Sequence, residues 1–240
     1  MITENKIRIG RFTSSEICAL TTLSKNKNDF GVPAINYINE KKIERRLGRG
    51  LTTSIDARPT LWGKCLESRI FNLLGLEYKL CSQETIPHPE YDFWAGSPDA
   101  EKFDEGKTVA DIKCPYTLKS FCNAYHCKTI DDFREEHNDG EKYFWQVVSN
   151  SILTGAKYGE LIFYCPYYSE LDEVRKHSID IEFTKIKNEY AWIFHALDSE
   201  IPYLPDGCYY KNIHTIRWEI SQKDKDFLTE KVIKANRLIN

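Results

Sequence analysis

Apolar side chains recur three and four residues apart in two long segments of the chain. "TLWGKCLESRIFNLLGLE" (60–77) and "YFWQVVSNSILTGA" (143–156) both show this spacing, which predicts two amphipathic helices. Thr60 is a candidate N-cap of the first helix, and Gly75 lies near its expected end. Gly155 is expected to close the second helix because glycine adopts the left-handed conformation that ends helices.

Weaker patterns predict more helical segments. "TSSEICALTTLS" opens with capping residues, and Ser14 or Ser15 is the expected N-cap of a helix there. The other expectations are a polar loop and a basic helix within 26–50, a helix at 116–126, a charged loop or lid at 128–141, and an exposed helix at 222–238.

Four segments read as strands. "EYKLCSQETI" (77–86) and "YGELIFYCPY" (158–167) are short and apolar, and "KTVADIKCP" (107–115) is stopped by its proline. "YDFWAGSPDA" (91–100) looks like a strand that runs into a turn. The order of helix, three strands, helix and strand predicts an α/β fold with a central mixed β-sheet flanked by helices.

Composition sets broad limits on this picture. The chain has 240 residues, 41% of them hydrophobic and 13% aromatic, which favours one folded domain over disorder. No run of about 18 apolar residues predicts a membrane span, and the first residues lack the apolar stretch of a secretory signal. A cytoplasmic protein is therefore expected. The net charge of −3 does not by itself indicate a nucleic-acid partner.

Two local features leave alternatives open. The run "KKIERRLGRG" (41–50) carries five cations, and it is either a solvated helix face or a surface that follows phosphates. The eight cysteines contain no CxxC pair, and only Cys122 and Cys127 lie close together in sequence. This spacing favours reduced thiols over a disulfide framework or a zinc site.

The segment "TVADIKCP" places charges in a strand that is otherwise apolar. Residues two apart share a face, so Val109, Asp111 and Lys113 point one way, and Ala110 and Ile112 point the other way. Burying the acid and the lysine without partners would be costly. Either the two form a salt bridge, or they serve a divalent cation, which prefers carboxylate oxygen ligands.

Other polar residues stand where apolar ones are expected. Asp99 follows "SP" and could supply a second carboxylate, while Glu67 lies on the apolar stripe of the 60–77 helix. Gln146 interrupts the stripe of the 143–156 helix, where a bond to a buried backbone group is the ordinary explanation. Arg8 precedes the hydroxyl-rich helix start around Ser15, which is either a phosphate site or an ordinary cap beside a surface arginine.

Taken together and in order, these motifs resemble the phage lambda exonuclease/YqaJ-like family of PD-(D/E)XK nucleases, which has a restriction-endonuclease-like core. The resemblance covers roughly residues 8–167, and no motif aligns after about residue 170. Two positions depart from the family: Asp111 stands where the closest relatives have Glu, and Val148 stands where some have Gln. The motifs are "RIGRFTSSE" (8–16), "LWGKCLES" (61–68), "SPD" (97–99), "DIKCP" (111–115) and "FWQVV" (144–148).

The resemblance implies a role for each matched residue. Asp99, Asp111 and the main-chain carbonyl of Ile112 would hold metal, with Glu67 as a further acid at the metal site. The cofactor implied is one or two Mg²⁺ ions, for which Mn²⁺ can substitute.

The remaining matched residues would act on water and on DNA. Lys113 would orient or activate the attacking water, and Gln146 would assist it. Arg8 and Ser15 would grip the 5′-phosphate of DNA, with Ser97 supporting the site.

By the same resemblance, residues 1–240 form one nuclease domain. It would have an N-terminal phosphate-pocket segment (1–58), a catalytic core (about 59–167) and a C-terminal strand and helix extension (168–240). The implied activity is 5′→3′ exonuclease digestion of double-stranded DNA ends, which leaves 3′ single-stranded tails for recombination. The implied assembly is a ring-shaped homo-oligomer, for which a trimer is favoured and a tetramer is the alternative. The implied partner is a single-strand annealing protein, and the implied setting is a bacterial or prophage-encoded protein.

Three alternatives remain open on the sequence. One is an endonuclease of the same fold, of the restriction or repair type. Another is a Cas4/AddB-like nuclease with an iron–sulfur cluster, which the cysteine spacing disfavours. The third is a catalytically inactive protein that binds DNA ends, which the intact set of catalytic residues disfavours.

Overall fold

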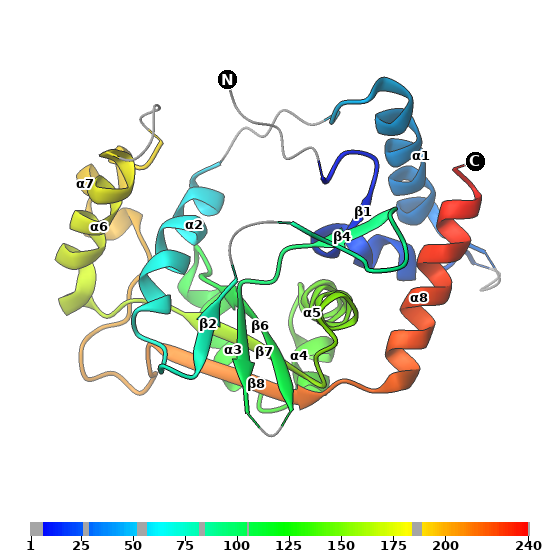
Figure 1. Ribbon diagram of the computed structural model, residues 1–240. Coiled ribbons are helices and arrows are strands. Elements are labelled where there is room, and N and C mark those ends of the chain that lie inside the picture. The colour runs from blue at the N-terminus through cyan, green and yellow to red at the C-terminus, as the bar shows by residue number, and fades with distance from the viewer. Residues whose placement is uncertain are drawn as a thin grey trace.

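A five-stranded mixed sheet forms the centre of the molecule (Figure 1). The computed structural model describes residues 7–25, 29–51, 57–81, 85–104, 106–183 and 189–239. The β6–β7 pair is parallel, and the other three pairs of the sheet are antiparallel. In spatial order the strands are β2 (Tyr78–Leu80), β5 (Ala100–Phe103), β6 (Lys107–Lys113), β7 (Tyr158–Tyr164) and β8 (Ile213–Glu219).

Strand β6 lies in the middle of this sheet, and its side chains alternate as the sequence predicts. Val109 packs in one apolar cluster, whereas Ala110 and Ile112 pack in a second cluster. Asp111 pairs in register with Leu161 of β7. Because β6 is covered on both faces, Asp111 becomes a buried carboxylate, with 1% of its side chain exposed.

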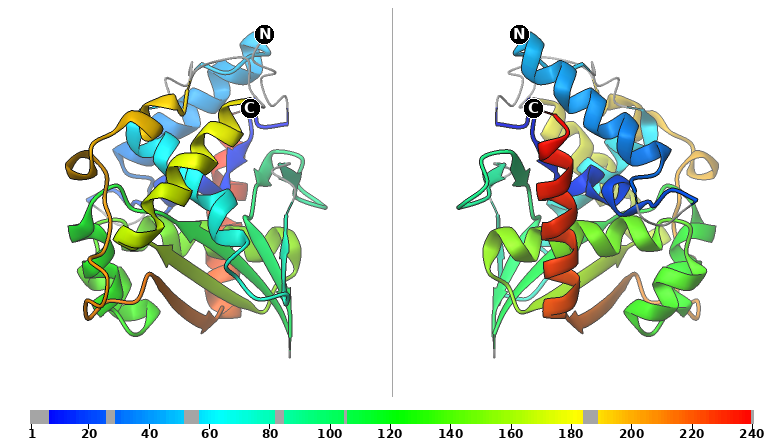
Figure 2. Two further views of the ribbon diagram at one scale, coloured as in Figure 1. Left: turned by 90° about the vertical axis from the view of Figure 1, so that its left-hand side faces the viewer. Right: turned by 90° about the vertical axis from the view of Figure 1, so that its right-hand side faces the viewer.

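Helices cover the two faces of the sheet. The cluster that includes Ala110 and Ile112 also takes in apolar residues of α2 (Arg58–Phe71), α6 (Leu171–Phe183) and α7 (Ala191–His195). Figure 2 shows α8 crossing α5 on the opposite side. That side is formed by α1 (Val32–Leu47), α3 (Leu118–His126), α4 (Ile130–Glu136), α5 (Gly140–Thr154), α8 (Gln222–Arg237) and the 3₁₀ helix η1 (Ser14–Thr21).

A second, small sheet brings distant segments together. Its order is β1 (Phe12–Thr13), β4 (Trp94–Gly96) and β3 (Ile86–Pro87), with β1 parallel to β4 and β3 antiparallel to it. The residues after β4 pass directly into β5 of the central sheet. The "SPD" stretch is therefore the link between the two sheets, and this link carries Asp99 to the centre of the molecule.

Several local predictions are confirmed. The helix 116–126 corresponds to α3, and the basic helix expected within 26–50 is α1, although residues 26–28 lie outside the described residues. Helix α5 ends at Gly155, whose φ of 71° is left-handed. The final helix is α8, but its expected exposure is only partly correct because three of its apolar residues are buried, namely Leu228, Val232 and Ala235.

Other local predictions are wrong for identifiable reasons. Helix α2 begins after Ala57 and ends at Phe71, because Pro59 fits the first turn and the apolar residues beyond Phe71 belong to a turn. Thr13, not Ser14 or Ser15, is the N-cap of η1, and its side chain makes no capping bond.

Two further predictions fail because a short element was overlooked. The segment 128–141 is not a loop, because Thr129 and Asp132 form a capping box that starts α4. "EYKLCSQETI" divides between β2 and β3, with residues 82–84 outside the described part. Strand β5 was not expected, since "AEKF" carries only a weak strand pattern.

Two short 3₁₀ helices complete the elements, η2 (Tyr168–Glu170) and η3 (Asp198–Glu200). In the described part of the chain, no helix combines the length and the apolar character that a membrane crossing needs. The division into 1–58, 59–167 and 168–240 stays a prediction.

Candidate active site

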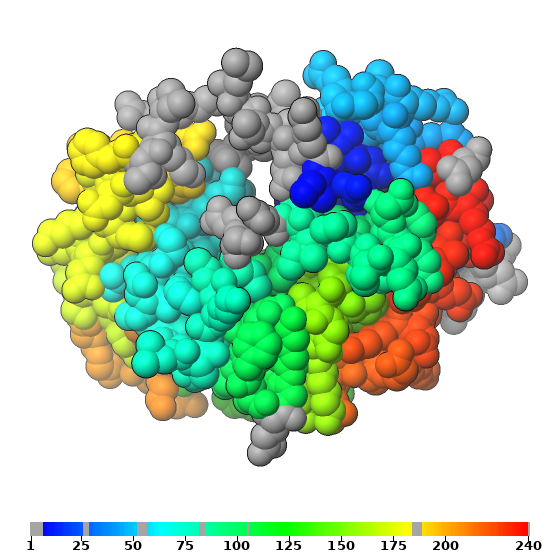
Figure 3. Space-filling view, viewed as in Figure 1, coloured from blue at the N-terminus to red at the C-terminus, as the bar shows by residue number. Residues whose placement is uncertain are grey.

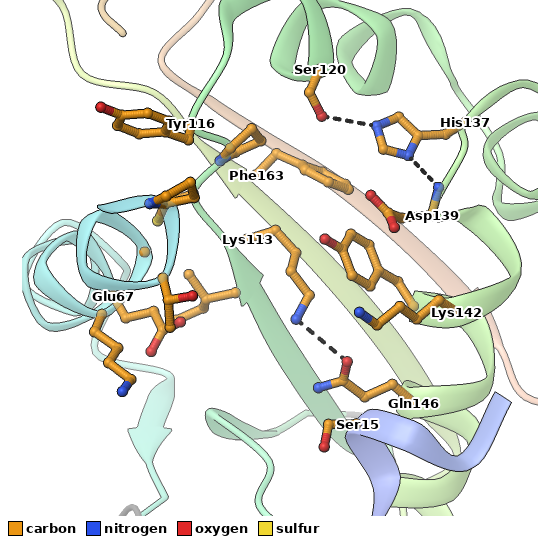
Figure 4. Close-up of a pocket in the computed structure, with 18 of the residues that line it drawn as sticks. Ser15, Glu67, Lys113, Tyr116, Ser120, His137, Asp139, Lys142, Gln146 and Phe163 are labelled. Carbon is orange, nitrogen blue, oxygen red and sulfur yellow. Dashed lines mark hydrogen bonds between the residues drawn. The ribbon is translucent and has the colours of Figure 1, made fainter. Parts of the chain in front are cut away.

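Asp111, Lys113 and Gln146 form a contiguous polar group at the end of β6. Lys113 Nζ lies 2.6 Å from Asp111 Oδ2 and 3.5 Å from Gln146 Oε1. Gln146 Nε2 donates to Asp111 Oδ1 at 2.8 Å. Figure 4 shows Gln146 reaching from α5 toward the Lys113 ammonium. The amide of Gln146 therefore serves charged side chains, not the buried backbone group that would be its ordinary partner.

Asp99 reaches the same strand from the link between the sheets. Its Oδ2 accepts the backbone N–H of Ile112 at 2.7 Å, which places this carboxylate beside the main chain between Asp111 and Lys113. Ser97, two residues earlier, turns to Thr85, and their hydroxyl oxygens are 3.1 Å apart. The "SPD" and "DIK" motifs thus meet, as the sequence predicts.

Glu67 of α2 faces the group from the opposite wall. Burial raises the pKa of Glu67, the Lys113 ammonium opposes that effect, and the Asp111 carboxylate adds to it. Figure 4 shows Glu67 on α2 across the cavity from Gln146. The carboxylate on the apolar stripe of this helix is therefore explained by its neighbours in the site.

Charge is unbalanced at the site. Burial, then the Asp111 and Glu67 carboxylates, raise the pKa of Asp99 well above its ordinary value. Burial alone would lower the pKa of Lys113, but Asp111 and Asp99 outweigh it and raise that pKa. One ammonium thus faces three acids, and the pKa values of two of them, Asp99 and Glu67, are raised. Such a site gains from further positive charge.

A cavity of about 740 Å³ opens onto this group. Residues from four of the sequence motifs line this cavity, including Arg8, Glu67, Lys113 and Gln146. Arg8 Nη2 donates to Ser15 Oγ at 3.0 Å, and Ser15 also lines the cavity. The structure therefore brings the Arg8–Ser15 pair into one hollow with Glu67, Lys113 and Gln146. Asp99 and Asp111 are in contact with this group but are not among the residues that line the hollow.

The fit of a divalent cation depends on the oxygens present. Among the described residues, no three His, Cys, Asp or Glu side chains form a group that could hold a metal by themselves. Mg²⁺, however, usually takes one or two carboxylates and fills its octahedron with water and substrate phosphate. Asp111 Oδ2 is buried and makes no aligned hydrogen bond, although Lys113 Nζ lies near it. The carboxylates of Asp99 and Asp111 therefore suit a hard cation that brings its own water.

The cavity is also lined by residues that the sequence analysis did not identify as functional. The Tyr143 ring lies 4.5 Å from Lys113 Nζ, and its position one turn before Gln146 was the available signal. His137 Nδ1 accepts the backbone N–H of Asp139 at 3.1 Å, and His137 Nε2 lies 3.1 Å from Ser120 Oγ. No local pattern indicated this pair, because the segment around His137 was expected to be a loop.

Comparisons with known proteins bear on the fold of this chain. The sequence matches no protein-family model and no curated protein. A crystal structure of an alkaline exonuclease from Laribacter hongkongensis is similar, with 16% identity, a TM-score of 0.59, and coverage of 99% of this chain and 92% of that chain. Another structure of that enzyme, in complex with dAMP, has 15% identity, a TM-score of 0.58, and coverage of 100% and 92%.

A phage-related exonuclease from Haemophilus somnus 129PT is similar as well. It has 16% identity and a TM-score of 0.61, and the match covers 98% of this chain and 96% of that chain. The chain therefore shares the restriction-endonuclease-like fold of these exonucleases over its full length. The resemblance inferred from the motifs is confirmed at the level of the fold.

Proposed function

We propose that this chain is a metal-dependent exonuclease that digests DNA. One observation carries the proposal: acids and a lysine from separate motifs, Asp99, Asp111 and Lys113, meet beside a cavity that also holds an arginine–hydroxyl pair. The shared fold of solved exonucleases supports the same conclusion. Glu67 and Gln146, which also belong to the sequence motifs, lie in the same group of polar residues.

Asp99, Asp111 and the carbonyl of Ile112 would hold one or two Mg²⁺ ions, or Mn²⁺ in their place, with Glu67 as a further acid. When bound, such ions lower the pKa of water and stabilise charge on the attacked phosphate and the leaving oxygen. Asp99 is kept close to β6 by the N–H of Ile112. Asp111 is kept in place by the amide of Gln146. The protein thus orients both carboxylates before any ligand arrives.

Lys113 acts in its charged form. Its pKa is raised by the nearby acids, so an ammonium stands at the site at neutral pH. That ammonium stabilises negative charge as it develops and orients a water, rather than accepting a proton. The Gln146 carbonyl oxygen and the Tyr143 ring face the same ammonium, and they limit its movement.

Arg8 and Ser15 would bind the terminal 5′-phosphate, with Ser97 supporting the site. A phosphate held there fixes the distance to the bond that is cut, which favours ends over internal positions. This supports 5′→3′ digestion of one strand of duplex DNA, which leaves 3′ tails for recombination by single-strand annealing. A ring-shaped homo-oligomer, most simply a trimer, a single-strand annealing partner and a cytoplasmic setting belong to the same proposal.

The test uses linear duplexes with 5′-phosphate or 5′-hydroxyl ends, labelled on one strand, with Mg²⁺ or EDTA. We expect digestion only with the metal, from the 5′ end, and faster on phosphorylated ends. Lys113→Ala should abolish digestion while it leaves DNA binding within a few fold. Lys142→Ala is the matched control, because this lysine lines the same cavity but is exposed. Normal turnover by Lys113→Ala would remove the lysine from the mechanism.

Adding covalently closed circular DNA to this experiment separates the alternatives. An endonuclease of this fold would cut covalently closed circles as readily as linear DNA. An inactive end-binding protein would retain the duplex in EDTA and in Mg²⁺ without shortening either strand. Either result would overturn the proposed exonuclease.

A further inference from the structure

The inner face of α1 carries polar groups that are almost completely buried. Tyr37, Lys41 and Glu44 lie on this face, with exposures of 6%, 7% and 5%. Lys41 opens the basic run 41–50, for which the sequence left two possibilities. For this residue neither holds, because Lys41 Nζ lies 3.0 Å from Glu44 Oε2 inside the protein.

Glu44 and Arg45 hold both polar groups of a single residue, Gly10. Glu44 Oε2 accepts the N–H of Gly10 at 2.9 Å, and Arg45 Nε donates to the carbonyl of Gly10 at 2.7 Å. The other oxygen of Glu44 accepts the N–H of Leu51 at 3.4 Å. The buried carboxylate is therefore satisfied by Lys41 and by two backbone donors, which offsets the cost of burying its charge.

The backbone of Gly10 can adopt this position only without a side chain. Its φ is 67°, and a Cβ would lie 2.5 Å from Arg45 Cγ. Three residues later, the N–H of Thr13 donates to the Tyr37 hydroxyl at 2.8 Å. Figure 3 shows the start of the described chain lying against α1. Helix α1 thus holds the segment at two points, Gly10 and Thr13.

The held segment lies between Arg8 and Ser15, the pair that faces the cavity. A side chain on a short turn keeps a fixed orientation only if the backbone that carries it is held in place. We infer that Glu44 and Tyr37 are positioning residues that set the preference for phosphorylated DNA ends, acting through Gly10 and Thr13. This inference rests on the proposed function, because it assigns selectivity to the pocket proposed there.

The test measures kcat/KM on matched duplexes with 5′-phosphate and 5′-hydroxyl ends. The variants are Tyr37→Phe, which removes one hydroxyl, and Glu44→Gln, which removes the charge but keeps the size. We expect the phosphate-to-hydroxyl ratio to fall by about tenfold in Glu44→Gln, the order of one charge-assisted hydrogen bond. The loss should lie in KM for phosphorylated ends, and kcat on hydroxyl ends should stay within about twofold.

Glu40→Gln is the control, because Glu40 also pairs with Lys41, at 2.8 Å, but 39% of its side chain is exposed. This variant should keep the wild-type ratio. Thermal unfolding of each variant checks the fold, and Tyr37→Phe carries the test if Glu44→Gln fails to fold.

The outcomes separate the inference from the proposed function. A wild-type enzyme without any preference for phosphorylated ends would overturn the pocket itself. A wild-type preference that persists unchanged in a folded Tyr37→Phe or Glu44→Gln protein would overturn the inference alone.

Discussion

Removing the ammonium of Lys113 should strongly destabilise the metal-free protein. Lys113→Met keeps most of the side-chain stem but leaves the Asp111 carboxylate without its cation. Asp111 is only 1% exposed, whereas 19% of the Lys113 side chain is exposed, so the acid cannot replace its partner with bulk water. Breaking a buried ion pair in this way costs about 3–5 kcal/mol.

The cost arises because a buried charge is left unpaired, so it depends on the Asp111 carboxylate. We therefore expect Lys113→Met to lower the free energy of unfolding by about 3–5 kcal/mol at pH 8.

The assay is urea unfolding in EDTA at pH 8, followed by tryptophan fluorescence. An unchanged m-value confirms that the same surface is exposed on unfolding. In the Asp111→Asn background, Lys113→Met should cost much less, because no buried charge is left unpaired. Lys142→Met serves as the control, since this lysine is exposed. An equal loss in the Asp111→Asn background, or a loss below about 1 kcal/mol in the wild-type background at pH 8, would refute the reasoning.

Three other substitutions probe the same region. The pKa of Asp99 is raised in the folded protein, whereas in the unfolded chain this carboxyl loses its proton above its ordinary pKa of 3.8, so the stability of the wild-type protein falls as the pH rises from there. Asp99→Asn should therefore raise the melting temperature in EDTA at pH 8 and lose this advantage near pH 4. The same variant should abolish digestion. Gly96→Ala should cost about 1–3 kcal/mol or more in urea unfolding, because its Cβ would lie 2.2 Å from Ser14 Oγ and 2.5 Å from Leu153 Cδ1; wild-type stability would contradict this packing. Asp111→Glu adds a methylene to a buried side chain and should cost about 1–3 kcal/mol by the same measurement, yet it should retain Mg²⁺-dependent digestion because the carboxylate remains.

A buried hydroxyl group links the segments that carry the site. Ser149 Oγ of α5 lies 2.8 Å from Ser14 Oγ and accepts the indole N–H of Trp94 at 2.9 Å. Ser14 precedes Ser15, which lines the cavity. Trp94 opens the strand that leads to Asp99, and Ser149 follows Gln146 by one helical turn. The two halves of the cavity are thus connected through the core, although no sequence pattern relates these three residues to one another.

Local pattern alone predicted the strand that carries Asp111 and Lys113 and the helix that carries Gln146. The alternation around Asp111 and Lys113 requires both side chains on one face, and the position of Gln146 on an amphipathic helix directs it toward the core. Periodicity depends on neighbouring residues, so it can be read without knowing the fold. The same reasoning failed at 128–141, where a short capped helix has too few turns to show a period.

Tertiary structure decided everything that depends on residues distant in sequence. The N–H of Ile112 became the partner of Asp99, and α1 turned Lys41 and Glu44 inward although their segment reads as a charged surface. The raised pKa values of Asp99 and Glu67 follow from the same convergence, since burial and the field of other carboxylates arise only when separate elements pack together. The sequence by itself determined which side chains could do chemistry, whereas packing determined which charges lie within reach of one another, because electrostatic energy depends on distance in space and on exclusion of water.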